Sequence, residues 1–348
     1  MVEKRASRRS GAAPTVADVA RAAGVSPMTV SRVVNGEPNV LDKTRARVRA
    51  AVDDLGYRPN VAARSLAGAR QDRIALLYAN PSAAYLSELL KGCLEQAGAK
   101  GLQLILEHFD PNEALPLLAA RLVSQRINAV LVPPPLCDLE PLLEVIRQAR
   151  LPMVQIATGN PSRLAHAVTI DDEAAAFALV RYLLEIGHRR IGFIEGDSNQ
   201  TVSALRRKGY ERALAAADIL PDQSLVVEGD FTYRSGLAAS ENLLALGERP
   251  TAIFASNDDM AAATVAVAHK HGLSVPEDLS VCGFDDTAMA TTIWPRLTTV
   301  RQPVAEMARI AIEILVQATE GGRSSGDRGG EHVQLAFEIV KRDSVAPR

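Results

Sequence analysis

Cysteine is scarce in this sequence of 348 residues. Cys93, Cys137 and Cys282 lie far apart, with no CxxC spacing and no histidine pair close by. Three isolated cysteines cannot form a disulfide framework, and they lack the spacing of a metal site. We therefore expect reduced, buried thiols and no bound metal ion.

Long apolar runs are also missing. No segment approaches the ~20 consecutive apolar residues that span a bilayer. The basic N-terminal stretch MVEKRASRRSGAAPT is not followed by the apolar core of a secretory signal. These features predict a protein that works in the cytoplasm, away from the membrane.

The common catalytic patterns are absent as well. The sequence contains no P-loop, HExxH or GxSxG motif and no glycine-rich dinucleotide fingerprint after a predicted strand, and its six histidines are scattered. The acidic pairs at 258–259 and 285–286 each open a predicted helix, where capping explains them. We therefore expect neither an enzyme nor a cofactor.

Charge is divided unevenly along the chain, although the net charge is only −2. Residues 1–70 contain 13 Lys/Arg and 6 Asp/Glu, whereas residues 71–348 contain 26 and 35. A basic segment attached to an acidic body predicts that the segment binds a polyanion. Because most of these basic residues lie among periodic apolar ones, they are expected to decorate a folded surface.

Three short helices are predicted in the basic segment. Thr15 and Asp18 can form a capping box for the first helix. Ser26-Pro27 begins a second helix that extends to about Val34, and a third runs from about Asp42 to Leu55, with Gly56 as its C-cap. Two short helices joined by a glycine-containing turn are typical of a helix-turn-helix unit, whose second helix enters the DNA major groove.

The residues of this segment resemble a known family. The run TVADVARAAGVSPMTVSRVVNGEPNVLDKTRARVRAAVDDLGYRPNVAARSLAG is similar throughout to the headpiece of the lactose-repressor (LacI/GalR) family. The resemblance implies that Pro27, Met28 and Arg32 face base edges and that Thr29, Ser31 and Asn35 contact phosphates. Position 27 departs from members with a polar or aromatic residue, so the operator sequence cannot be transferred. DNA contacts are also implied for Thr15, Ser26, Asn60 and Ala63.

The segment PNVAARSLAG at 59–68 is compatible with a helix but too short to be stable alone. Its residues alone indicate a linker that is helical only part of the time. The resemblance implies a hinge helix that folds when two copies pair on DNA, with Leu66 wedged into the minor groove. Loss of this helix would provide the switch.

From residue 72 onward, short apolar runs alternate with amphipathic stretches, in two sets. This βα alternation predicts parallel sheets covered by helices, forming two Rossmann-like lobes that are each completed by distant sequence. The body resembles the family's effector domain, which is similar to periplasmic sugar-binding proteins. We therefore expect a basic disordered tail at 1–14, a headpiece at 15–58, a hinge at 59–70 and an effector-binding and dimerisation domain at 71–348. Its N-lobe is predicted at about 71–168 plus 299–329 and its C-lobe at about 169–298 plus 330–348.

Polar residues that follow the predicted strands are candidates for ligand binding, because ligands of open α/β sheets lie beyond the carboxyl ends of the strands. By resemblance, Arg206, Asn257 and Asp285 hydrogen-bond ligand hydroxyls, and Phe231 supplies a ring for the apolar face of a sugar. Asn80, Ser82 and Tyr85 are further candidates. Each also has a purely structural explanation, as a helix cap, a surface ion pair or a core residue.

The resemblance implies a repressor that releases DNA when a small sugar-like inducer binds. A purine-type member, which binds DNA only with a corepressor, is the alternative, and a free sugar-binding protein is a remote one. One recognition helix reads few bases, so a homodimer on a pseudo-palindromic operator is expected. The sequence ends without a leucine heptad tail, so the family's tetramerising device is not expected. The effector and the regulated genes stay open.

Overall fold

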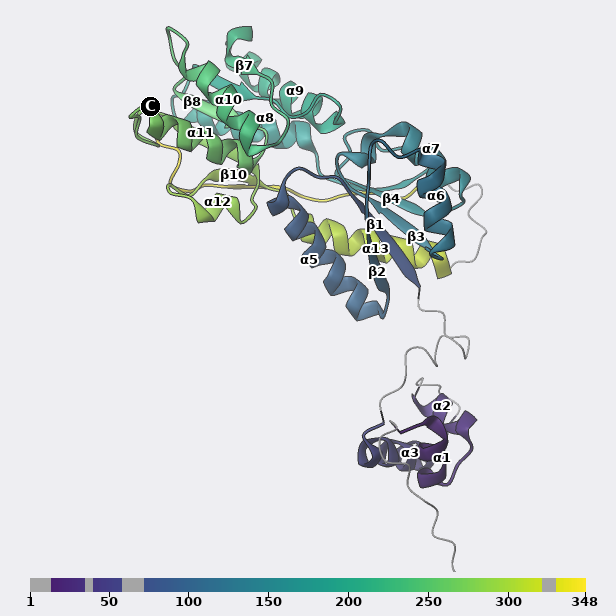
Figure 1. Cartoon of the computed structure of the whole chain (residues 1–348). Helices are drawn as coiled ribbons and strands as arrows, with labels where there is room; N and C mark the ends of the chain where they lie inside the picture. Colours follow the sequence, from purple (N-terminus) through teal and green to yellow (C-terminus); the bar gives the residue numbers. More distant parts are fainter. Residues whose placement is uncertain (1–13, 35–39, 58–71, 321–329) are drawn as a thin grey trace, which may run out of the picture. The chain divides into compact units, whose positions relative to one another are not determined.

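The computed structural model describes residues 14–34, 40–57, 72–320 and 330–348. The chain forms two compact units, Met1–Gln71 and Asp72–Arg348, which are considered separately (Figure 1). Among the described residues, no helix is long and apolar enough to cross a membrane.

The N-terminal unit contains three helices, α1 (Val16–Ala23), α2 (Pro27–Val34) and α3 (Asp42–Leu55). The predicted capping box at Thr15 is present, with Thr15 N donating to the Asp18 carboxylate over 3.0 Å. Gly24 and Gly56 end α1 and α3 in the left-handed conformation, which glycine adopts without a Cβ penalty. The three helices confirm the predicted helix-turn-helix unit, and the ends of the second and third helices agree with those predicted.

Periodic apolar side chains hold these helices together. Val19, Val30 and Val48, one from each helix, are fully buried against one another. Arg47 fastens α3 to the turn after α1, because its Nη2 donates to the carbonyl oxygen of Ala23 over 2.7 Å. Tyr57 closes the core from beyond α3, whereas Leu55 at the end of α3 is 37% exposed.

The C-terminal unit contains two six-stranded sheets. The first has the order β11-β5-β4-β3-β1-β2, and all of its strand pairs are parallel. Its strands are β1 (Arg73–Tyr78), β2 (Gln103–His108), β3 (Ala129–Val132), β4 (Met153–Ile156), β5 (His166–Thr169) and β11 (His332–Gln334). Around it lie α5 (Ala83–Lys100), α6 (Leu115–Ser124), η1 (Leu136–Asp138), α7 (Glu140–Gln148) and α13 (Val304–Glu320).

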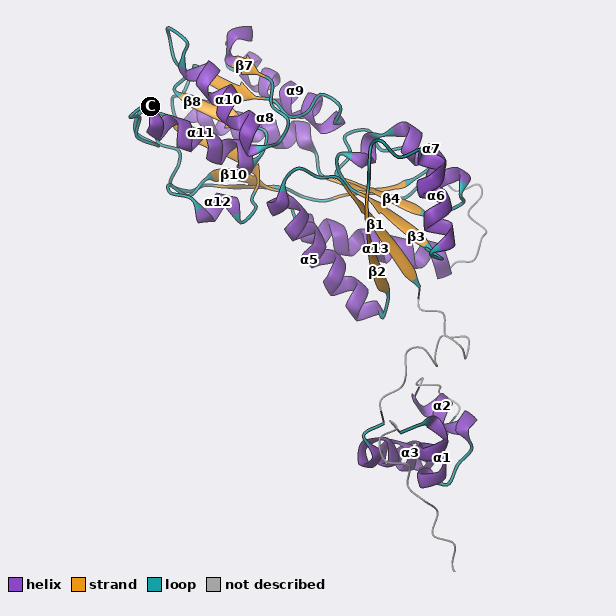
Figure 2. Cartoon of the chain, viewed as in Figure 1, coloured by secondary structure: helices purple, strands orange, loops and turns teal. Residues whose placement is uncertain are grey.

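The second sheet has the order β12-β10-β9-β8-β6-β7, with β12 antiparallel to β10. Its strands are β6 (Ile191–Ile194), β7 (Val226–Val227), β8 (Ala252–Ala255), β9 (Ser280–Asp285), β10 (Thr298–Arg301) and β12 (Glu338–Val340). Its helices are α8 (Asp172–Glu185), α9 (Thr201–Ala215), η2 (Gln223–Leu225), α10 (Tyr233–Leu244), α11 (Asp258–Lys270) and α12 (Met289–Thr292). Helices lie on both faces of each sheet (Figure 2).

Side-chain alternation explains the layering around β1. Ile74 and Leu76 pack into the cluster that contains α5 and α13, and Ala75 and Leu77 pack into the cluster that contains α6 and α7. Successive residues of a strand point to opposite faces, so a strand buried on both faces is apolar throughout. Helices α5 and α13, far apart in sequence, lie side by side on one face (Figure 1).

The C-terminal part of the chain contributes to both sheets, and two of its strands, β10 and β11, lie in the sheet opposite to the one expected. The expected N-lobe included 299–329, whereas β10 pairs with β9 in the second sheet, with Thr298 opposite Cys282. The expected C-lobe included 330–348, whereas β11 pairs with β5 in the first sheet, with Val333 opposite Val168. The apolar pattern of a short strand is the same in either sheet, so the sequence alone does not reveal its pairing partner.

Candidate functional site

The exposed surface of α2 is the candidate DNA-binding surface. Pro27, Met28 and Arg32 are exposed, with Met28 at 66%, and Thr29 and Ser31 are half-buried. Ser26 caps the helix, since its Oγ accepts from the backbone N of Thr29 over 3.2 Å. Thr15 is likewise engaged in capping α1. The other predicted DNA contacts, Asn35, Asn60, Ala63 and Leu66, lie outside the described residues.

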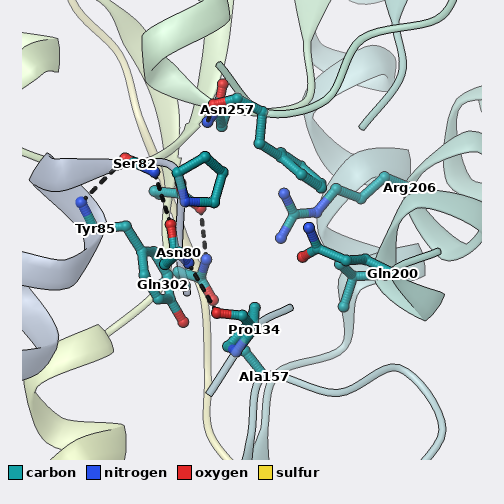
Figure 3. A pocket seen from close by; sticks show the side chains of 13 residues that line it. Asn80, Ser82, Tyr85, Pro134, Ala157, Gln200, Arg206, Asn257 and Gln302 are labelled. Atoms are coloured by element: carbon teal, nitrogen blue, oxygen red, sulfur yellow. Dashed lines mark hydrogen bonds between the residues drawn. The ribbon is translucent and has the colours of Figure 1, made fainter. Parts of the chain in front are cut away.

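A cavity lies between the two lobes of the C-terminal unit, with residues of both lobes in its wall. The structure brings all seven predicted ligand-binding residues to its wall: Asn80, Ser82, Tyr85, Arg206, Phe231, Asn257 and Asp285. Six further lining residues were not predicted: Pro81, Pro134, Ala157, Gln200, Val202 and Gln302 (Figure 3).

The cavity lies at the carboxyl ends of parallel strands from both sheets. Asn80 follows β1, Pro134 follows β3 and Ala157 follows β4 in the first lobe. Asn257 follows β8 and Gln302 follows β10, and Asp285 ends β9 in the second lobe. Strand ends that face each other across a cleft gather polar side chains from distant sequence, as the strand-end rule predicts.

Arg206 is held rigidly in the wall. Its Nε donates to Asp172 Oδ1 over 2.8 Å, and its Nη1 donates to the carbonyl oxygen of Ser256 over 2.6 Å. The guanidinium carbon lies 3.7 Å from the ring centroid of Phe284. Arg206 and Asp172 are only 4% and 2% exposed, so this ion pair is buried.

Close packing of α9 on α8 brings this pair together. A Cβ at Gly209 would lie 2.3 Å from the carbonyl oxygen of Glu173, so only glycine allows this approach of the two helices. Arg206 lies one turn before Gly209 on α9, and Asp172 is the first residue of α8. The guanidinium therefore reaches Asp172 and points into the cavity (Figure 3).

Asp285 is the carboxyl group in the cavity wall. Its Oδ1 accepts a hydrogen bond from Gln302 Nε2 over 2.5 Å. Burial raises the pKa of Asp285 to about 7, against the opposing influence of Arg206 and of the bond from Gln302. Its φ of 109° is a strained backbone value for a non-glycine residue.

Two buried polar atoms in the wall lack a hydrogen-bond partner. The hydroxyl of Tyr85 and the Oε1 of Gln302 are both enclosed without one. Leaving a buried polar group unpaired costs about 1–3 kcal/mol. Such atoms in a cavity wall indicate a ligand or water that completes them.

Other wall residues fix the shape of the cavity. Asn257 Oδ1 caps α11 by accepting from Met260 N over 2.9 Å, and its Nδ2 donates to the carbonyl oxygen of Phe231 over 2.8 Å. Asn80 accepts from Ser82 N over 2.8 Å and donates to the carbonyl oxygen of Pro134 over 3.2 Å. Asn257 thus has the capping role anticipated as its structural explanation, whereas Asn80 fixes the loop that precedes α5.

Hydrogen bonds join the lobes beside the cavity. Ser82 Oγ donates to the carboxylate of Asp259. Asp138 Oδ2 accepts from the backbone N and the hydroxyl of Thr201 over 2.8 and 2.9 Å. These hydrogen bonds hold the two lobes together beside the cavity.

Phe231 rests directly on the backbone of Gly196. A Cβ at Gly196 would lie 2.0 Å from the ring carbon Cζ of Phe231. Gly196→Ala must therefore displace the ring, and we expect the free energy of unfolding to fall by about 1–3 kcal/mol. Thermal unfolding of the full chain measures this. Gly247→Ala is the control, since a Cβ there meets nothing within 4 Å; equal melting temperatures for the two variants would contradict the assignment.

The missed lining residues had weak sequence signals. Gln302 follows a strand, but the strand was expected to cross into the other lobe. Gln200 and Val202 surround the start of α9, where no motif marks them. Pro81 and Pro134 follow β1 and β3, and an apolar residue there was not considered as a lining residue.

Comparison with known proteins agrees with this architecture. Residues 15–60 match the family described as bacterial regulatory proteins, lacI family, and residues 180–345 match a periplasmic binding protein-like domain. Catabolite control protein A of Priestia megaterium is 36% identical over 305 residues, covering 87% of this chain and 92% of that protein. The transcriptional repressor PurR of Pectobacterium carotovorum is 36% identical, covering 95% and 97%.

Solved structures extend the similarity to the fold. A complex of the transcriptional regulator CelR with cellobiose is 31% identical, with a TM-score of 0.72, and covers 95% of this chain and 99% of that one. A lac repressor dimer bound to operator and the anti-inducer ONPF is 27% identical, with a TM-score of 0.77, covering 96% and 99%. With the helix-turn-helix unit and the two-lobed α/β unit, these identities show that the chain belongs to the LacI family of bacterial transcriptional regulators.

Proposed function

We propose that the chain is a sequence-specific repressor whose operator binding is released by a small sugar-like inducer. The observation that carries this proposal is the cavity built jointly by both lobes, with Tyr85 on one side and Arg206 and Asp285 on the other. Because both lobes contribute to the wall, a ligand that fills the cavity changes the stability of the closed arrangement of the lobes relative to the open one. The regulator CelR, 31% identical, was solved with cellobiose.

The DNA-binding residues in this proposal are on α2 and in the hinge. Met28 and Arg32 would contact bases, together with Pro27, and Thr29, Ser31 and Asn35 would contact phosphates. Thr15, Ser26, Asn60 and Ala63 would add contacts, and Leu66 would enter the minor groove. A homodimer would align two such surfaces on a pseudo-palindromic operator, in the cytoplasm where bacterial DNA lies.

A corepressor-dependent regulator is the second candidate, because repressors named PurR are as similar in sequence to this chain as the regulator solved with cellobiose. In both proposals the cavity binds a ligand without chemical conversion. The similar proteins are regulators by name, and this supports a binding function over a catalytic one.

The test is an operator titration. A preferred DNA sequence is first selected from a random duplex library with the full chain, and its affinity is measured at fixed salt, because phosphate contacts make affinity salt-dependent. Cellobiose, glucose, galactose, hypoxanthine and guanine are then added. Weaker DNA binding with a sugar supports the inducer mechanism. Tighter DNA binding with a nucleobase would mean that the ligand increases operator affinity, and it would establish the corepressor alternative.

Leu66→Ala tests the proposed hinge. The exchange removes an apolar side chain that would insert at an unstacked base step and stabilise it. We therefore expect at least about tenfold weaker binding to the selected duplex. The melting-temperature shift caused by a bound sugar should be unchanged. Leu220→Ala, at a leucine that is 88% exposed, is the control and should leave both properties as they are. Loss of the sugar-induced shift in Leu66→Ala would argue against a role confined to DNA.

A further inference from the structure

Helix α9, which carries Arg206, begins without a cap of its own. Within the described range 72–320, its N-cap residue Gln200 makes no capping side-chain hydrogen bond, and its first turn contains no acidic residue. The other long helices of the second lobe, α8, α10 and α11, are each capped by the side chain that precedes them: Asp171, Thr232 and Asn257. A helix N-terminus leaves backbone N–H groups without an intrahelical acceptor and carries partial positive charge. The start of α9 therefore needs an acceptor from another element.

The first lobe supplies that acceptor. Asp138, in η1, accepts hydrogen bonds at Oδ2 from the backbone N of Thr201 over 2.8 Å and from its hydroxyl over 2.9 Å. Its Oδ1 accepts from the hydroxyl of Thr158 over 2.6 Å, so the carboxylate is oriented from within its own lobe. A carboxylate at a helix N-terminus also interacts favourably with the helix dipole. Asp138 thus caps α9 across the boundary between the lobes.

Gly159 allows this close approach of the lobes. Its backbone N donates to the hydroxyl of Thr201 over 2.7 Å. A Cβ at Gly159 would lie 2.8 Å from Leu205 Cδ1 and 2.9 Å from the carbonyl carbon of Thr201, and both atoms belong to α9. The φ of Gly159 lies outside the left-handed region, so its own backbone does not require glycine. The requirement for glycine therefore comes from the opposite lobe.

This contact is separate from the ligand-facing surface. Its three residues are not among the described residues that line the cavity. Helix α9 and its N-cap nevertheless carry three residues that do line it, Gln200, Val202 and Arg206. Gln200 and Arg206 point into the cavity from this side (Figure 3). Any change at the contact therefore reaches the cavity wall through α9.

We propose that Asp138, Gly159 and Thr201, together called the α9 junction, hold the two lobes together in the absence of any ligand. Asp138 is the positioning residue of this junction, because it fixes the α9 side of the cavity wall against the first lobe. The proposal goes beyond the proposed function, since it concerns the free chain and does not depend on which ligand binds. A ligand that fits the joined lobes then binds an arrangement that is already populated.

Double electron–electron resonance between two spin labels measures the arrangement of the lobes in the full, ligand-free chain. The labels are attached at Leu117→Cys in the first lobe and Leu220→Cys in the second, whose native side chains are 61% and 88% exposed. The native cysteines are buried. Labelled chain is diluted with excess unlabelled chain, so that a dimer carries one labelled copy. The expected result for the parent is a single narrow distance distribution.

Three variants weaken the junction in different ways. Asp138→Asn removes the charge of the acceptor, Gly159→Ala adds a methyl group that meets α9, and Thr201→Val removes the hydroxyl but keeps the backbone donor. In each, the fraction of chains outside the parent's distance peak should rise at least about fivefold, because a hydrogen bond to a charged group or a close contact between the lobes is lost. Thr201→Ser keeps both donors and should reproduce the parent distribution.

Asp222→Asn is the matched control. Asp222 Oδ1 accepts from the backbone N and the hydroxyl of Ser224 over 2.9 and 2.6 Å, which is the same chemistry within the second lobe alone. This variant should lower the melting temperature without changing the distances. If Asp138→Asn and Gly159→Ala behave in the same way, their role is only structural and the proposal is wrong. A broad distribution in the parent that these variants leave unchanged would also overturn it.

Operator affinity of the same variants, measured without ligand on the selected duplex, separates this proposal from the proposed function. If the distances shift and DNA affinity changes in one common direction at least about threefold, both proposals are supported. If the distances shift while DNA affinity stays as in the parent, the α9 junction is supported and regulation through the lobes fails.

Discussion

Replacing Arg206 by methionine is expected to lower the free energy of unfolding of the C-terminal unit by about 3–5 kcal/mol. The exchange keeps much of the aliphatic volume but leaves Asp172 buried, 2% exposed, without its partner at 2.8 Å. The carbonyl oxygen of Ser256 also loses its donor at 2.6 Å. Breaking one side of a buried ion pair costs more than the pair itself contributes, because an isolated charge stays in a poorly solvated place.

The second half of this prediction concerns its pH dependence and its rescue. Burial already raises the pKa of Asp172, and Arg206 opposes that rise. Without Arg206 the pKa of Asp172 rises further, so the folded variant binds a proton that the unfolded chain has lost. The loss in free energy of unfolding, relative to the parent, therefore grows as pH increases. Asp172→Leu in the same chain should restore much of the stability, because an apolar pair leaves no buried charge.

Urea unfolding followed by circular dichroism at pH 6 and pH 8 measures both effects. Arg181→Met is the matched control, since Arg181 pairs with Glu185 on α8 with both side chains 61% exposed. Exposed pairs contribute about 0–1 kcal/mol. A loss in Arg206→Met no larger than in Arg181→Met would refute the view that this pair organises the cavity wall.

The cavity illustrates what a sequence of this kind reveals. Asn80, Asn257 and Asp285 were predictable because polar residues that follow parallel strands gather at one edge of a sheet. The helix boundaries of the headpiece were predictable for a local reason, since Thr15, Ser26 and Gly56 are caps whose chemistry acts within a few residues.

Other features depend on pairing over long distances. The positions of β10 and β11 follow from their partners β9 and β5, and nothing in a three-residue or four-residue strand identifies that partner. Gln302 was therefore not predicted as a site residue, although it holds Asp285 in place. Asp172 was not predicted for a related reason, because only the close approach of α8 and α9 at Gly209 shows that it neutralises Arg206.

The second large effect is expected from Asp285→Asn and its dependence on pH. The pKa of Asp285 is about 7 in the folded chain, against a usual value of 3.8. Between these values the folded state holds a proton that the unfolded state has released, so this group makes the protein less stable as pH rises, by about 1.4 kcal/mol per pH unit. Above about pH 7 both states are ionised and the loss stops increasing.

Asparagine has nearly the same shape but does not ionise. We therefore expect the free energy of unfolding of Asp285→Asn, relative to the parent, to increase steadily from pH 5 to about pH 7 and then to level off. Urea unfolding of both proteins at pH 5, 6, 7 and 8 gives this difference directly. Glu277→Gln, at an exposed carboxyl in the same unit, serves as the control and should run parallel to the parent across the range.

The titration of Asp285 should also make ligand affinity depend on pH, but affinity should rise with pH where stability falls. Hydroxyl groups that donate to Asp285 favour its ionised form, so a bound neutral sugar lowers the pKa of Asp285 and releases a proton near pH 6. Affinity should then rise with pH up to about 7 and stay level above it. Strain and burial at Asp285, with φ at 109°, thus cost stability in the free protein that a ligand recovers. A pH-independent affinity in the parent would show instead that the carboxyl group does not contact the ligand.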